Sequence, residues 1–259
     1  MGFIFAVLIG LSLGLLGGGG SILTVPVLIY IVKMSPKDSI ALSLAIVGIT
    51  SLFGLYKHLK DGNINKKVSL LFIPFAIGGT FLGTYLAQFI PAQIQLIIFA
   101  IIMILAAIFM FKGRENLKSN SEDIKASLII PVAIVLGIMT GIIGVGGGFL
   151  IVPTLVILAG LEMKKAVGTS LLIIAINSLS GFLGYLNYIE VPWLFLIQFS
   201  AFSIVGIFIG AALVKKIKAD SLRKGFAVFL IIMGTFILYK NKNQLMQTSE
   251  VKTTQLKNN

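Results

Sequence analysis

Residues 14–26 read GLLGGGGSILTVP, and residues 141–153 read GIIGVGGGFLIVP. Both stretches lie inside long apolar runs, and Gly141 follows Gly14 by 127 positions. Glycine is, after proline, the residue that least favours a helix interior. Clusters of glycine inside segments apolar enough for a membrane therefore predict the same helix break at two related places in the chain.

The composition around these stretches is that of a membrane protein. Of 259 residues, 57% are hydrophobic and 12% are charged, whereas soluble domains carry about 25% charged residues. Apolar runs cover residues 2–32, 40–56, 68–90, 94–111, 127–161, 166–186, 191–214 and 225–239. Runs of roughly twenty apolar residues are typical of membrane-spanning helices. We therefore expect an all-α polytopic membrane protein.

The charged and reactive residues exclude several other classes. The net charge of +12 comes largely from lysines between apolar runs, where membrane proteins carry them, so we expect no nucleic-acid partner. Cysteine is absent and His58 is the single histidine, beside Lys57 and Lys60. With no nucleophile–base pair and no metal-ligand cluster, we expect no enzyme, no catalytic residues, no metal and no cofactor.

The two glycine stretches belong to a longer duplication. An offset of 127 aligns the chain without a gap from Gly10 to about Phe111, and the matches include glycine, proline and serine. Matched positions include Gly10/Gly137, Gly14/Gly141, Gly17/Gly144, Gly19/Gly146, Gly20/Gly147, Pro26/Pro153, Ser43/Ser170, Ser51/Ser178, Gly54/Gly181, Gly79/Gly206 and Gly83/Gly210. We predict two homologous repeats at residues 1–112 and 127–240, a charged linker at 113–126 and a polar, disordered tail at 241–259.

The orientation of the repeats depends on the first run of each. A single crossing of residues 2–32 would make the halves parallel and split lysine and arginine evenly between the two membrane faces. If this run instead enters, breaks at the glycines and returns, each half crosses an odd number of times. Only Lys33, Lys37 and the tail then lie on the membrane face opposite the other basic residues. The positive-inside rule favours this inverted arrangement, with both termini outside.

A glycine-broken helical hairpin at the start of each repeat would make an anion site. Half-helices that meet inside the membrane leave N–H groups free, and a helix N-terminus carries roughly half a positive charge. Glycine lets a ligand approach the backbone closely. The predicted cradle comprises Gly17, Gly18, Gly19, Gly20 and Ser21 in the first repeat and Gly144, Gly146, Gly147 and Gly148 in the second. The alternative role, helix packing, is the one we expect for the glycine pairs spaced by four, at 10/14, 79/83, 137/141 and 206/210.

A few polar side chains inside the apolar runs complete the predicted site. They are Thr24, Ser43, Thr50, Thr169, Ser170 and Asn177. Serine and threonine often hydrogen-bond their own helix, so the amide of Asn177 is the most informative of the group. Its repeat mate is Thr50, and we expect this pair to line a central cavity.

These residues resemble a known family. The doubled G-x-x-G-x-G-G-G-x-x-x-x-P pattern, complete at residues 141–153, and the string GTSLLIIAINSLSGFLGYL at 168–186 are similar to the sulfite exporter TauE/SafE family. The resemblance covers residues 10–239; the first repeat departs from it where Ala41 stands in place of the glycine at 168. It implies a transporter of the cell membrane for small sulfur-containing anions such as sulfite or organosulfonates.

The expected function is therefore export of a small anion by alternating access. The apolar runs lack an obvious acidic residue for proton or sodium coupling, and the membrane potential by itself favours anion exit, by about 2.3 kcal/mol per charge per 100 mV. An anion-selective channel that uses the same glycine cradle is the alternative. The expected partners are the anion and the lipid bilayer, and homo-oligomerisation stays open.

Overall fold

The computed structural model describes residues 2–18, 20–111, 126–213 and 224–240, the last without 226 and 229. Gly19, most of the predicted linker and the predicted tail at 241–259 lie outside the described residues. Every regular element within these ranges is an α-helix, so the all-α prediction is confirmed.

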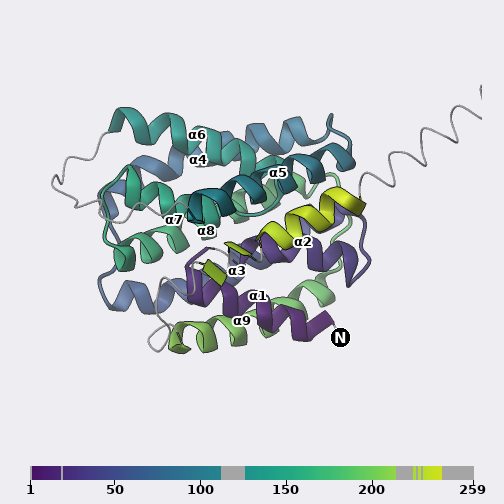
Figure 1. The fold of residues 1–259 in the computed structure, drawn as a ribbon, viewed down its shortest axis with the longest axis horizontal. Coiled ribbons are helices and arrows are strands. Elements are labelled where there is room, and N and C mark those ends of the chain that lie inside the picture. The colour runs from purple at the N-terminus through teal and green to yellow at the C-terminus, as the bar shows by residue number, and fades with distance from the viewer. Residues whose placement is uncertain are drawn as a thin grey trace, which may run out of the picture.

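The helices follow the apolar runs of the sequence (Figure 1). They are α1 (Gly2–Leu16), α2 (Ser21–Tyr30), α3 (Pro36–Lys60), α4 (Lys66–Ala87), α5 (Ala92–Phe111), α6 (Ala126–Ile143), α7 (Gly148–Ile157), α8 (Met163–Tyr185), α9 (Trp193–Leu213) and a C-terminal helix at Leu230–Lys240. Side-chain caps begin two of them: Ser35 Oγ accepts the N–H of Asp38 at α3, and Asn65 Oδ1 accepts that of Val68 at α4.

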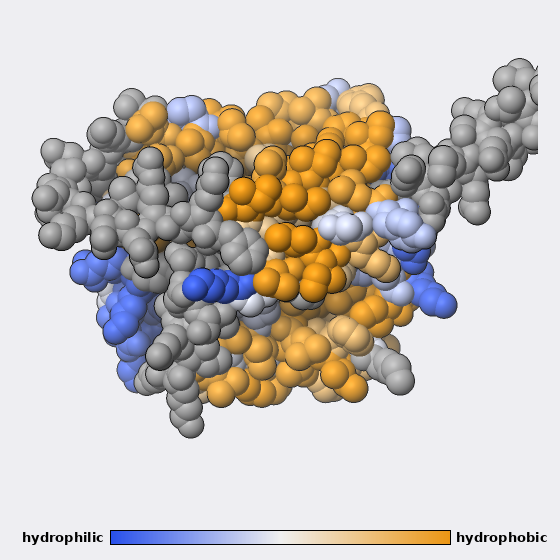
Figure 2. Space-filling view, in the orientation of Figure 1, coloured by the Kyte–Doolittle hydropathy of each residue, from blue (hydrophilic) through white to orange (hydrophobic). Residues whose placement is uncertain are grey.

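The helix lengths and the surface agree with a membrane protein. In the described part of the chain, α3, α4, α8 and α9 are each long and apolar enough to span a bilayer. On the face shown in Figure 2, apolar side chains cover the middle of the molecule, and most of the hydrophilic groups lie toward its two ends. This distribution is the one that a surrounding bilayer requires.

Both glycine stretches interrupt a helix, as predicted. The first break separates α1 from α2, and the second separates α6 from α7. In the first pair the chain turns back along itself. A Cβ built on Gly20 would lie 2.8 Å from Cγ of Leu13, and one on Gly2 would lie 3.5 Å from Cγ2 of Val32. The end of α2 thus returns to the beginning of α1, which makes the pair a hairpin.

The second break has the same local contacts. A Cβ on Gly147 would lie 2.6 Å from Oγ1 of Thr140 and 3.8 Å from the carbonyl oxygen of Leu136. These two residues stand 127 positions after Leu13 and Ile9, the neighbours of Gly20. The start of α7 therefore lies against the last turns of α6 just as α2 lies against α1.

Each hairpin packs against a helix from the other half of the chain. In Figure 1, α1 lies beside α9 and α6 lies beside α4. The backbones approach closely because the contacts are glycines: a Cβ on Gly14 would lie 2.8 Å from the N of Ala211, and one on Gly141 would lie 2.6 Å from the N of Thr84. The glycine pairs spaced by four thus have the packing role that the sequence predicts.

Helices α3 and α8 form the centre of the molecule. They pack against each other, and about 72% of the apolar part of α3 and 67% of that of α8 is buried, against 39% for α4 and for α9. Both glycine breaks are held against this central pair, through contacts between Gly144 and Ile40 of α3 and between Gly17 and Val167 of α8. Side chains of α3 and α8 therefore lie against both breaks.

Candidate functional site

The second break, at residues 144–148, is a turn that only glycine adopts easily. Gly144, Gly146 and Gly147 have φ angles of +75°, +67° and +66°. A side chain in this left-handed region is strained, and a Cβ on Gly144 would lie 2.8 Å from the Cα of Ile40. The three glycines therefore end α6 and turn the chain so that α7 begins in the interior of the protein.

The beginning of α7 leaves backbone donors inside the protein. The N–H groups of Leu150 and Ile151 both donate to the carbonyl oxygen of Gly147, each at 3.0 Å. The N–H groups of Gly148 and Phe149 come earlier, where an α-helix has no acceptor of its own to offer. This end of α7 therefore presents unpaired N–H groups and a partial positive charge.

Two adjacent side chains of α8 add further donors, and one of them lies beside the glycines. Ser178 lies against Gly146, where an added Cβ would come within 2.6 Å of its Oγ. Asn177 is 2% exposed; its Oδ1 accepts a hydrogen bond of 2.5 Å from Thr80 Oγ1 of α4, which points its Nδ2 away from Thr80. Neither Ser178 Oγ nor Asn177 Nδ2 has a hydrogen-bond partner. Buried donors without partners are costly, and such groups in a native protein call for a ligand or another explanation.

One carbonyl group at each break accepts a hydrogen bond from a serine of the central helices. Ser43 Oγ of α3 donates to the carbonyl oxygen of Gly144. Ser170 Oγ of α8 donates to the carbonyl oxygen of Gly17, at 2.8 Å. The carbonyl groups of Gly144 and Gly17 thus have donors, whereas the N–H groups at the start of α7 have no acceptor, so the second break favours a ligand that accepts hydrogen bonds.

The first break has a similar but not identical geometry. Gly17 has a φ of +68°, whereas Gly20, which precedes α2, has a helical φ of −68°. Ser21 Oγ donates to the carbonyl oxygen of Gly18 at 2.7 Å. Thr24 Oγ1 is buried and has no partner. The first break therefore offers one unpaired side-chain group, the hydroxyl of Thr24.

The two breaks meet each other in the interior. A Cβ on Gly18 would lie 2.8 Å from the Cα of Gly148, and one on Gly148 would lie 2.7 Å from the Cα of Gly18. Backbone contacts backbone here, and neither position tolerates a side chain. The two cradles predicted from the sequence are therefore parts of one region.

Two of the predicted polar residues are engaged elsewhere. Thr50 Oγ1 donates to the carbonyl oxygen of Ile46 in its own helix, at 2.6 Å. Thr169 Oγ1 accepts the N–H of Asn65, at 2.9 Å, and so ties α8 to the start of α4. Neither hydroxyl is directed to a glycine break by these bonds.

Two residues at the site were not among the predicted site residues. The sequence could have identified Ser178, because it matches Ser51 in the duplication. In the structure, Ser51 Oγ is likewise buried and without a partner. The sequence could not have identified Thr80, because its repeat mate is Ile207, an apolar residue. The contact between Thr80 and Asn177 joins residues 97 positions apart and needed the structure to be seen.

The site is polar but has no buried formal charge. None of the Asp, Glu, Lys or Arg side chains that the structure describes is buried, and no cluster of three potential metal ligands occurs among them. Serine, asparagine and backbone N–H groups supply hydrogen bonds and partial charges only. Such a site can replace the hydration shell of a small anion without holding it by a full ion pair.

Comparisons with known proteins agree over most of the chain. The family model described as Sulfite exporter TauE/SafE matches residues 2–237. A probable membrane transporter protein of Xylella fastidiosa is 30% identical over 242 residues, which cover 90% of this chain and 92% of the relative. The probable membrane transporter protein YdhB of Bacillus subtilis is 27% identical over 238 residues, covering 90% and 97%. No solved structure matches the chain.

Proposed function

The chain belongs to the sulfite exporter TauE/SafE family of multi-pass cell-membrane transporters, and we propose that it exports a small sulfur-containing anion. Sulfite and organosulfonates are the proposed class, carried by alternating access around the two glycine breaks. The protein is a transporter and not an enzyme.

The observation that carries the proposal is the set of unpaired donors at the second break. The start of α7 leaves backbone N–H groups free, and Asn177 Nδ2 and Ser178 Oγ are buried without partners. A tetrahedral or pyramidal oxyanion has several acceptor oxygens with which to accept from such donors. Hydrogen bonds to charged groups contribute about 1.5–3 kcal/mol each, so a few of them stabilise the bound anion by several kcal/mol.

The charge of the site supports efflux that is not coupled to the movement of protons or sodium ions. Transporters driven by protons or sodium commonly use acidic residues inside the membrane, and the described acidic residues are not buried. An anion that leaves the cell moves down the membrane potential, which contributes about 2.3 kcal/mol per charge per 100 mV. We therefore propose that the potential and the anion gradient drive transport.

The proposed architecture is a pair of inverted repeats, residues 1–112 and 127–240, joined by the linker at 113–126. The hairpin of α1 and α2 returns to the side on which it began, and α3, α4 and α5 then cross three times. The second hairpin would begin from the opposite face. The exchanged packing of α1 on α9 and of α6 on α4 supports a two-fold relation between the repeats. Transporters of this type bind substrate at the repeat interface.

The test is flux through purified protein in proteoliposomes with a panel of sulfite, methanesulfonate, acetate and chloride, with and without an imposed potential. We expect saturable flux of the sulfur oxyanions that an inside-negative potential accelerates outward. Ser178→Ala should reduce this flux. Its matched control is Ser180→Ala, on the same helix, where the hydroxyl donates at 2.9 Å to the carbonyl oxygen of Ile176.

Two results would count against the proposal. Flux that rises in proportion to concentration without saturating would support an anion-selective channel instead. Equal flux in Ser178→Ala, Ser180→Ala and the unaltered protein would remove Ser178 from the anion site. Homo-oligomerisation is not part of the proposed mechanism, because both breaks come from one chain.

A further inference from the structure

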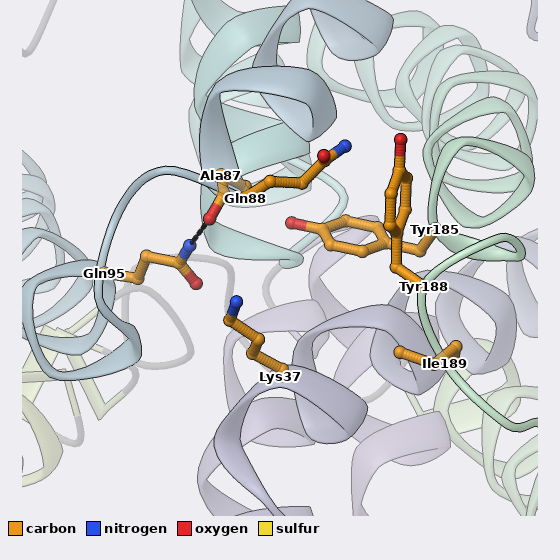
Figure 3. A pocket seen from close by; sticks show the side chains of 7 residues that line it. All are labelled: Lys37, Ala87, Gln88, Gln95, Tyr185, Tyr188 and Ile189. Atoms are coloured by element: carbon orange, nitrogen blue, oxygen red, sulfur yellow. Dashed lines mark hydrogen bonds between the residues drawn. The ribbon is translucent and has the colours of Figure 1, made fainter.

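A polar cavity lies at one end of the helix bundle, beyond the second glycine break. Its volume is about 180 Å³, and it is enclosed by the beginnings of α3 and α5, the end of α4 and the loop after α8 (Figure 3). The lining residues are Lys37, Ala87, Gln88, Gln95, Tyr185, Tyr188 and Ile189. Pockets for drug-sized molecules measure roughly 300–1,000 Å³, so this cavity suits only a small ion or molecule.

The cavity has a buried floor and an exposed rim. Gln95 is 2% exposed and Tyr185 is 5% exposed, whereas Lys37 and Tyr188 are exposed. Gln95 Nε2 donates to the carbonyl oxygen of Ala87 at 2.6 Å, which fixes the carboxamide in place. The cavity is therefore preformed at its base and open to the aqueous side at Lys37.

Among the described residues that line this cavity, Lys37 is the only charged one. In Figure 3 its ammonium group points into the space between Gln95 and Tyr185. The neighbouring acidic residue, Asp38, is engaged in the cap of α3, where Ser35 Oγ donates to its Oδ2 at 2.6 Å. Glu190, which follows Ile189, is exposed. The lining thus combines one cation with amide and phenol groups and favours an anion.

The cavity lies directly over the second glycine break. Helix α3 carries Lys37 at the rim and then Ile40 and Ser43, which contact Gly144. At 1.5 Å rise per residue, Ser43 lies about 9 Å further along the helix than Lys37. Tyr185, in the floor, donates from its hydroxyl to the carbonyl oxygen of Gly141 at 2.7 Å, one turn before the break. The floor of the cavity is therefore built on the hairpin itself.

We propose that this cavity is an outer binding site for the transported anion, with Lys37 as its charged group. The proposal rests on the proposed function and extends it. In the inverted arrangement Lys37 faces outward, so an exported anion passes from the break at residues 144–148 to Lys37 before it leaves. The Tyr185 hydroxyl, which holds the carbonyl of Gly141, separates the two positions while the hairpin is in the position seen here.

The first test measures binding without transport. Protein in a neutral detergent is treated with an amine-reactive ester, and the modification of Lys37 and Lys33 is quantified by mass spectrometry. We expect sulfite and methanesulfonate to protect Lys37 severalfold more than Lys33, at an ionic strength held constant with chloride. Dimethyl sulfone, a neutral analogue, should protect neither. Equal protection of the two lysines would overturn the proposal.

Anionic lipid offers the same chemistry, since a headgroup phosphate could occupy the cavity. The labelling is therefore repeated with vesicles of neutral lipid and with vesicles that contain an anionic phospholipid. Protection of Lys37 by the anionic lipid alone, with none from sulfite or methanesulfonate, would overturn the proposal in favour of a lipid site.

The second test measures flux with variants at the rim. Lys37→Gln should raise severalfold the half-saturating concentration for anion that enters from the Lys37 side, and Lys37→Arg should restore it. Lys33→Gln removes the same charge from a residue outside the cavity and should leave the value unchanged. The protein could transport the anions although they do not protect Lys37 from labelling and Lys37→Gln does not change the half-saturating concentration. That result would overturn the outer site but not the proposed function. Conversely, sulfite or methanesulfonate could protect Lys37 although the protein transports none of the tested anions. That result would overturn the proposed function but not the anion site at Lys37.

Discussion

The hydroxyl of Ser170 donates to the carbonyl oxygen of Gly17 across 2.8 Å, between residues 153 positions apart. The same residue type makes the same contact at the other break, from Ser43 to Gly144. A helix that stops inside a membrane must satisfy the carbonyl groups it leaves, because an unpaired group in hydrocarbon costs several kcal/mol. Each half of the chain thus supplies the serine that satisfies the interrupted helix of the other half.

We predict that Ser170→Ala destabilises the protein. Gly17 would keep a buried carbonyl oxygen without its donor, which costs about 1–3 kcal/mol. The measurement is the thermal unfolding midpoint of the purified protein in detergent. Ser180→Ala is the control, since it removes a hydroxyl that bonds only its own helix. An equal shift in the two variants would show that the bond to Gly17 contributes nothing specific.

Gly147→Val should abolish transport and leave membrane insertion intact. The φ of +66° at Gly147 is strained for any side chain, and an added Cβ would lie 2.6 Å from Thr140 Oγ1. The control is Gly62→Val, at a φ of +68° in the loop after α3, where an added Cβ meets nothing within 4 Å. Comparing the two variants distinguishes the effect of backbone strain at a positive φ from the effect of a side chain placed in the break. Transport that survives in Gly147→Val would remove this glycine from the cradle.

Asn177→Leu should weaken anion affinity about tenfold to a hundredfold. The change removes the unpaired Nδ2 donor at nearly constant volume, and one hydrogen bond to a charged group contributes about 1.5–3 kcal/mol. Thr80 would retain its second acceptor, the carbonyl oxygen of Gly137 at 3.1 Å. The half-saturating concentration for flux measures the effect. Thr50→Val, which removes a hydroxyl bonded to its own helix, should change it little; a larger effect from Thr50 than from Asn177 would contradict this site.

The inverted arrangement predicts that Lys60 and Asn187 lie on opposite sides of the membrane. They occupy equivalent positions at an offset of 127, and both are exposed. The protein has no native cysteine, so Lys60→Cys and Asn187→Cys give single labelling sites. A membrane-impermeant thiol reagent applied to intact cells should label Cys at 187 and not at 60. Labelling of both from the same side would establish parallel repeats.

Much of the fold can be predicted from the sequence because its strongest signals are local. Runs of apolar residues fix where helices lie, and the glycine clusters fix where two of them break. The apolar composition also limits the prediction, since almost every face of these helices is hydrophobic. The pairing of α1 with α9 depends on which small residues meet, such as Gly14 and Ala211, and no local pattern identifies the partner.

The residues of the candidate site could likewise be predicted only in part. The glycines, Ser43, Ser170 and Asn177 could be identified as residues unusual for their surroundings. Thr50 and Thr169 share that signal, but the Thr50 hydroxyl bonds its own helix, as threonine commonly does, and the Thr169 hydroxyl accepts the N–H of Asn65 at the start of α4. The cavity lined by Lys37 could not be predicted from the sequence. Its walls come from separate elements, and its glutamines and tyrosines are ordinary residues at a membrane surface.

The contact between Gly18 and Gly148 has a mechanical consequence. With no side chains between them, the two hairpin tips are in direct backbone contact, so there is no room for one tip to move toward the other unless the other also moves. In the proposed transport cycle, this contact therefore couples the movements of the two hairpins and leaves no passage between their tips for water or small ions.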